Sequence, residues 1–196
     1  MGPPWMLVRL ALETTVHHQQ ADDDRLTAID VNTLDAYRAF LRRVFSFEAA
    51  VETAIAAAGI EPMFTNGRFK AELIRSDLFE LGCEPPMIAK VNVRSTAHAM
   101  GWLFVIERHT LLAGLIRRHI QRTLETSAVG YLSAYDDAPG IRFRGLGDAL
   151  GVYAQRHSPR SIISGANEAF RAQRQWYTND SPGDVVVEPH DTAESL

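Results

Sequence analysis

Residues 97–119 limit most strongly what this chain can fold into. They read AHAMGWLFVIERHTLLAGLIRRH and follow Ser95, a residue type that often caps the start of a helix. Their apolar residues recur at helical spacing rather than in the alternation of a strand, and no proline interrupts the chain before about residue 125. We therefore expect one long central helix from Ser95 to about Glu125, against which the other elements pack.

One face of this predicted helix mixes apolar and charged side chains. Followed by threes and fours, the face reads Gly101, Phe104, Arg108, Leu112, Leu115 and His119. An arginine and a histidine on an otherwise apolar face need polar partners, because burial of an unpaired charge is costly.

The rest of the chain also shows helical spacing, and no segment shows a convincing strand pattern. Further helices are predicted at residues 5–20, 33–58, 68–81 and 141–156, with a last one that begins at Ser158-Pro159 and continues through Trp176. Gly59 and Gly82 stand where the second and third helices should stop. We predict an all-α single domain of about six main helices over residues 1–178, with a disordered acidic tail at residues 179–196.

Composition excludes several classes of protein. The net charge of −4 gives no electrostatic case for binding nucleic acid. Cys83 is the only cysteine, which excludes an intramolecular disulfide and a multi-cysteine metal site and is typical of a cytoplasmic protein. The first 15 residues lack the pattern of a signal peptide, and no apolar run approaches a membrane span, so we expect a cytoplasmic protein without a membrane partner.

The segment GWLFVIERHTLLAG resembles the distal helix of bacterial heme oxygenases, which reads close to GWLYVLEGSxLGG. Two glycines of that family pattern are Arg108 and Leu112 in this chain. The matching residues are Gly101, Trp102, Leu103, Val105, Glu107 and Leu111.

Other segments resemble the same family in the same order, over about residues 7–177. They are ETTVHHQQAD, DAYRAFLRRVFSFEAAVE, KAELIRSDLFELG, GIRFRGLGDAL and SGANEAFRAQRQWY. This collinear resemblance implies a heme oxygenase-like helical bundle, with a cleft between the first helix and the central one. It also implies an activity: the opening of heme, with O2 and electrons from an external donor or redox partner protein, to biliverdin, iron and carbon monoxide.

The resemblance places His18 at the position of the axial iron ligand, because Thr14 and Asp22 match the residues that flank this ligand in the family. His17 is the alternative. Adjacent helical side chains point about 100° apart, so only one of the two can face the cleft. A further alternative is that both are surface histidines beside an acidic run.

Other positions of the resemblance imply contacts to heme. Phe104 would line the pocket, and Arg118 and His119 match a basic pair that would bind the propionates, although cations near a helix end also complement the helix dipole. Glycines allow the family's distal helix to approach the heme closely. Leu112 would fill that space or push the helix outward, and Arg108 would reach a propionate or a carboxylate such as Asp77. We therefore expect heme turnover to be slow or atypical.

Two alternatives to a heme oxygenase stay open. In the first alternative, the chain is a degenerate protein of the same fold that binds heme, another tetrapyrrole or a protein partner without turnover. A third interpretation, a diiron oxygenase, would pair Glu107 with His109 or Glu48 with Glu52. It ranks last because the chain has no Glu-x-x-His motif.

Overall fold

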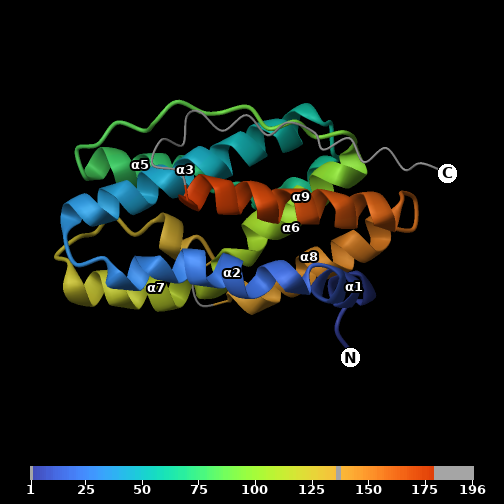
Figure 1. The fold of residues 1–196 in the computed structure, drawn as a ribbon, viewed down its shortest axis with the longest axis horizontal. Helices are drawn as coiled ribbons and strands as arrows, with labels where there is room; N and C mark the ends of the chain where they lie inside the picture. Colours follow the sequence, from blue (N-terminus) through green and yellow to red (C-terminus); the bar gives the residue numbers. More distant parts are fainter. Residues whose placement is uncertain (1, 136–137, 179–196) are drawn as a thin grey trace.

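The computed structural model describes residues 2–135 and 138–178, and this part of the chain contains helices and no strand (Figure 1). The all-α prediction is therefore confirmed. In chain order the elements are α1 (Trp5–Glu13), α2 (Thr15–Leu26), η1 (Thr27–Asp30), α3 (Leu34–Ala57), α4 (Pro62–Thr65), α5 (Ala71–Glu80), α6 (Thr96–Arg108), α7 (Thr110–Thr123), η2 (Tyr131–Ser133), α8 (Pro139–Tyr153) and α9 (Pro159–Thr178).

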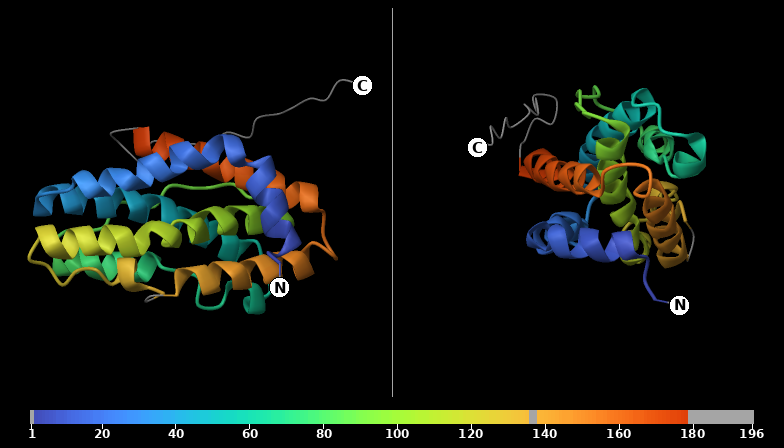
Figure 2. Two further views of the ribbon diagram at one scale, coloured as in Figure 1. Left: turned by 90° about the horizontal axis from the view of Figure 1, so that it is seen from below. Right: turned by 90° about the vertical axis from the view of Figure 1, so that its right-hand side faces the viewer.

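Helix α6 lies in the middle of the bundle. Figure 1 places it between α3 and α9 above and α2 and α8 below, and the end-on view in Figure 2 shows the same surroundings. Every residue of α6 from Ala97 to Glu107 is buried. One apolar cluster joins α6 to α1, α8 and α9, and a second lies between α3, α5 and α7.

The first predicted helix is divided in two at Thr14. Thr14 has φ −119° and ψ 10°, and its hydroxyl donates a hydrogen bond to the Leu10 carbonyl at 2.6 Å. The second part, α2, does not end near Gln20 but runs through the three aspartates to Leu26, and Asp24 is buried. The acidic run is thus part of a helix that packs against α7 and α9, with Asp23 exposed and Asp24 buried.

The predicted central helix is also divided, at His109. The Thr110 hydroxyl donates to the Glu107 carbonyl at 2.7 Å, and the His109 side chain is buried. A side-chain hydroxyl that bonds to a helix carbonyl bends the helix. The break at residues 108–110, named here the α6–α7 bend, thus forms without a glycine.

Two predicted helix ends are confirmed by backbone geometry. Gly59 follows α3 with φ +72°, and Gly82 follows α5 with φ +67°. Both lie in the left-handed region, which glycine adopts without the penalty of a side chain.

Helices α6 and α9 cross with their backbones in contact. A Cβ built on Gly101 would lie 2.0 Å from the Ile162 carbonyl oxygen, and one built on Gly165 would lie 2.0 Å from the His98 carbonyl oxygen. Only glycine at these two positions permits so close a crossing. This crossing fixes α6, and therefore the α6–α7 bend, relative to the rest of the bundle.

The stretch Thr96–Thr123 is long and apolar enough to cross a membrane, contrary to the expectation that no such run exists. Two thirds of its most apolar window, 67%, is buried inside the bundle, which is the behaviour of a core helix. The predicted tail at residues 179–196, and with it the domain boundary, lies outside the described residues.

Candidate functional site

His18 lies half-buried on α2, and its ring is held by a hydrogen bond. Its Nε2 atom is 2.8 Å from the Thr14 hydroxyl oxygen. The single hydroxyl proton of Thr14 already goes to the Leu10 carbonyl, so the Thr14 oxygen can only accept. His18 therefore donates through Nε2–H, which leaves Nδ1 as its bare nitrogen.

His17 and His18 both contact Phe170 of α9 but face different neighbours. His17 stacks on Phe170 with ring centres 5.6 Å apart and lines a groove of about 460 Å³ between α2 and α9. His18 meets Phe170 at 5.5 Å in a tilted arrangement and lies within the electrostatic reach of Arg108 and Asp22. Burial lowers the pKa of His18 and the Arg108 guanidinium lowers it further, so its imidazole is neutral near pH 7.

Arg108 connects the α6–α7 bend to α2 through Asp22. The Arg108 Nη1 atom lies 2.5 Å from Asp22 Oδ1, and Nη2 lies 2.7 Å from Oδ2. This is the bidentate geometry in which arginine and a carboxylate pair most strongly. The suggested partner Asp77 was wrong, because its carboxylate accepts the backbone N–H groups of Gly130 and Tyr131, both at 2.8 Å.

The two apolar candidates lie on either side of Arg108. Phe104 is buried and packs against Phe143, with ring centres 5.7 Å apart, and against Phe170 at 6.3 Å. Leu112 is half-buried and packs against the apolar cluster between α3, α5 and α7.

The basic pair lies farther along α7. Arg118 is exposed, and it lines a surface hollow of about 350 Å³ with His119, beside Ile29 of η1. The Nε2 atom of His119 donates to the Val31 carbonyl at 2.8 Å. Ten residues separate Arg118 from Arg108, which is about 15 Å along a helix. The structure thus brings His18, Phe104 and Arg108 together. It leaves Arg118 and His119 apart from them, at the surface hollow farther along α7.

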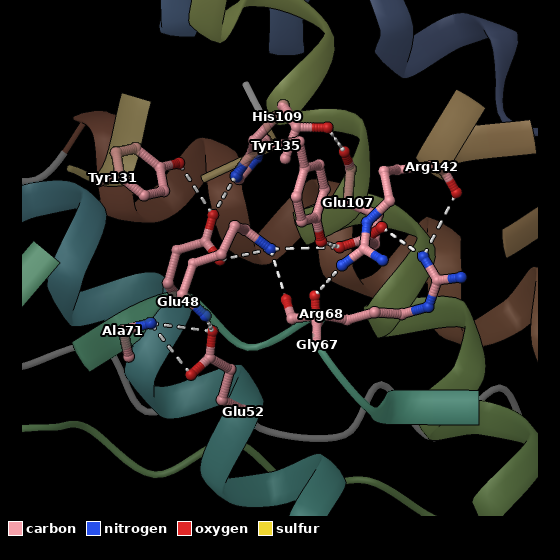
Figure 3. Close-up of polar contacts among 12 residues, drawn as sticks. Glu48, Glu52, Gly67, Arg68, Ala71, Glu107, His109, Tyr131, Tyr135 and Arg142 are labelled. Carbon is pink, nitrogen blue, oxygen red and sulfur yellow. Dashed lines mark hydrogen bonds and ion pairs between the residues drawn. The ribbon is translucent and has the colours of Figure 1, made fainter. Parts of the chain in front are cut away.

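A buried polar cluster lies behind the α6–α7 bend (Figure 3). Glu107, at the end of α6, pairs with Arg68 at 2.6 Å and Lys70 at 3.3 Å and accepts a hydrogen bond from Tyr135. These contacts hold the last turn of α6 in place from the side opposite to α2.

Glu48 of α3 holds the other half of this cluster. It lies 2.9 Å from His109 Nδ1, accepts from the Tyr131 hydroxyl at 3.1 Å, and is 3.7 Å from the Lys70 ammonium. Burial alone would raise the pKa of Glu48, but Lys70 and His109 outweigh it and hold that pKa below its usual value. His109 is thereby fixed at the bend.

The residues of the diiron interpretation are close together, but a lysine lies among them. The Lys70 ammonium is placed between the Glu48 and Glu107 carboxylates, and burial raises the pKa of nearby Glu52 to about 7. Within residues 2–135 and 138–178, no group of three or more potential ligands is arranged to hold a metal ion. Lys70 itself supplies the cation that these carboxylates need.

The sequence pattern did not predict the role of Lys70 or Tyr131. One signal was present: Glu48 falls four residues after Val44 on the apolar stripe of α3, so its carboxylate had to be buried. Nothing local indicated which cation would meet it, since Lys70 comes from a different element.

A comparison with solved structures shows that the bundle resembles a protein of known structure. Over 88% of this chain and 89% of the other, the structure is similar to the NO- and CO-bound heme oxygenase from Neisseria meningitidis, with a TM-score of 0.71 and 23% identity. The chain has the heme oxygenase-like fold. No protein-family model matches the sequence, and no curated relative matches it. The similarity therefore establishes the fold, and the activity has to be argued from the residues.

Proposed function

We propose that this protein binds heme between α2 and the α6–α7 bend, with His18 as the iron ligand, and that it opens heme oxidatively to biliverdin at a slow or atypical rate. The observation that carries the proposal is the placement of a neutral, half-buried His18 opposite Arg108 of the bend, in a heme oxygenase-like fold.

The residues around His18 suit a flat, apolar, anionic molecule. His18 offers an imidazole nitrogen, and the buried rings of Phe104 and Phe170 make its surroundings apolar. Arg118 and His119 supply polar contacts for carboxylates farther along α7. Bound heme would supply the iron at which O2 is activated, with electrons from an external donor or a redox partner protein. Ligation through Nε2 requires His18 to release its hydrogen bond to Thr14.

A titration with hemin tests the iron ligand. We expect the natural protein to give a Soret band typical of a histidine-ligated heme, and His18→Ala to lose that spectrum because His18 is the imidazole placed beside Arg108. His17→Ala is the matched control and should keep the spectrum, since His17 lines the groove on the α9 side. If His17→Ala loses the spectrum and His18→Ala keeps it, the ligand is the neighbouring residue.

A second candidate function is binding of heme or another tetrapyrrole without turnover. The Arg108–Asp22 ion pair favours it, because this pair joins the two helices that would flank the ligand. Addition of reductant and O2 to the hemin complex separates the two functions: loss of the Soret band with formation of biliverdin supports an oxygenase, and an unchanged band supports a binding protein.

Restoring glycine at positions 108 and 112 should raise heme turnover or heme affinity. Leu112 adds four carbons where the family has only backbone, and overfilling a packed interior costs about 1–3 kcal/mol. The double variant Arg108→Gly, Leu112→Gly removes this bulk, although each glycine costs roughly 1 kcal/mol of helix stability. The measurement is the rate of biliverdin formation at saturating hemin.

Leu111→Gly is the control for that experiment. Leu111 is exposed on the same turn of α7, so its replacement carries the stability cost of glycine without opening the space near Arg108. Two results together would contradict this prediction: the double variant is no faster than the natural protein, and the natural protein is as fast as heme oxygenases that keep both glycines. The side chains of Arg108 and Leu112 would then not limit the reaction.

A further inference from the structure

We infer that Arg108 is the binding residue for a carboxylate group of the ligand, and that Asp22 occupies the position which that carboxylate takes. The inference rests on the proposed function, because it concerns the same site. It assigns to Arg108 a contact that selects ligands with acidic side chains.

The two halves of the ion pair differ in their access to water. The Arg108 side chain is only 15% exposed, whereas that of Asp22 is 36% exposed. An arginine buried to this degree needs a counter-charge, since removal of one partner of a buried pair leaves an uncompensated charge. Asp22, once released, is hydrated at the surface. A carboxylate of the ligand can therefore replace Asp22 as the partner of Arg108. The released Asp22 is then hydrated, and Arg108 keeps a counter-charge.

The geometry at Arg108 already fits a carboxylate. Both terminal nitrogens of the guanidinium, Nη1 and Nη2, donate to the two oxygens of Asp22, at 2.5 Å and 2.7 Å. This planar fork binds any carboxylate presented edge-on, and a point charge such as lysine does not reproduce it.

The position also suits a ligand centred on His18. Asp22 is four residues beyond His18, about 6 Å along the axis of α2. Arg108 and Asp22 both lie close enough to His18 for their charges to act on its imidazole. An acidic ligand held by His18 would therefore lie beside Arg108, and its carboxylates would compete with Asp22 for the guanidinium.

The test compares hemin with hemin dimethyl ester, whose propionates carry no charge, by measuring the dissociation constant of each from the Soret change. We expect Asp22→Asn to bind hemin about tenfold more tightly than the natural protein, because the internal competitor for Arg108 is gone, and to bind the ester no more tightly. Arg108→Gln should lose most of the preference for hemin over the ester, and Arg108→Lys should lose part of it.

Asp24→Asn is the matched control. Asp24 is on the same helix and pairs with Arg174 of α9 at 2.5 Å, so its replacement also removes one ion pair of α2. It should leave the preference for hemin over the ester as it is in the natural protein. Melting temperatures of all variants without hemin show whether each is folded.

The outcomes separate this inference from the proposed function. If the natural protein binds hemin and the preference over the ester is the same in every variant, the pair only fastens α6 to α2 and the inference is overturned, while the proposed function stands. If hemin binds to Asp22→Asn alone, heme binding by the natural protein is refuted and the role of Arg108 stands. If no folded variant binds hemin, both are refuted.

Discussion

Gly165→Ala is expected to lower the stability of this protein by about 3 kcal/mol, the upper end of the usual cost of overpacking, which for a domain of this size is a fall in melting temperature of roughly 6–12 °C. The added Cβ would lie 2.0 Å from the His98 carbonyl oxygen and 2.9 Å from its carbonyl carbon. These are backbone atoms of α6, so no side chain can rotate to relieve the overlap, and the whole of α6 has to move away from α9. Calorimetry or thermal unfolding followed by circular dichroism measures the effect.

Gly114→Ala is the control, because the same substitution is made in a helix where there is room. The nearest atom to a Cβ at Gly114 is Arg118 Nη1 at 3.6 Å, an ordinary contact with a flexible side chain. Alanine also restricts the unfolded chain, so this variant should be as stable as the natural protein or more so. Equal melting temperatures for Gly165→Ala and Gly114→Ala would contradict the close crossing of α6 and α9.

The course of most helices could be predicted from the sequence because it depends on local signals. Apolar spacing places α3, α5, α8 and α9, and the glycines at positions 59 and 82 end two of these four helices with positive φ. The breaks at Thr14 and His109 could not be predicted in this way. Each depends on a threonine hydroxyl that bonds to a helix carbonyl, and a threonine in the same sequence position can equally point to solvent.

Contacts between residues that are distant in the chain could not be predicted from the sequence. Arg108 was expected to need a partner, but whether this was Asp77 or Asp22 depends on how α2 packs beside α6, and that packing is tertiary. His18 was selected by resemblance to a family, and its spacing alone did not distinguish it from His17. The structure adds the neighbours that give each histidine a different environment.

Lys70→Met is expected to destabilise the protein by about 3–5 kcal/mol, because it removes the cation from a buried pair of carboxylates. The Lys70 side chain is 1% exposed, and those of Glu48 and Glu107 are fully buried. Burial alone would lower the pKa of Lys70, but the two carboxylates outweigh it and raise that pKa above its usual value. Methionine fills a similar volume without the charge. The expected fall in melting temperature near pH 7.5 is roughly 6–20 °C.

The chain offers a matched control, since Lys90 is its only other lysine and is exposed in the segment before α6. Lys90→Met makes the same chemical change at the surface, where substitutions alter stability by no more than about 0.5 kcal/mol. A Lys70→Met variant that melts within a degree of Lys90→Met would show that the ammonium does not neutralise Glu48 and Glu107.

The effect of Lys70→Met should also depend on pH with a defined sign. In the natural protein the pKa of Glu48 is lowered, so its contribution to stability is present above its unfolded pKa and is lost as the pH falls through the folded value. The pKa of Lys70 is raised, so its contribution is present below the unfolded value and is lost as the pH rises through the folded one. The pair therefore contributes fully between about pH 5 and pH 10.

Without Lys70, burial is no longer outweighed at Glu48, and the pKa of this carboxyl should rise above its unfolded value. The variant then gains stability as the pH falls from 7.5 to 5, because protonation removes the buried charge. Lys70 also lowers the pKa of Glu52, which is about 7 in the natural protein, so the loss of Lys70 should raise that pKa too and add to the same trend. The gap in melting temperature between the natural protein and Lys70→Met should thus narrow at pH 5. A gap that stays constant or widens would mean that lost packing, rather than a buried Glu48 carboxylate without its lysine partner, destabilises the variant.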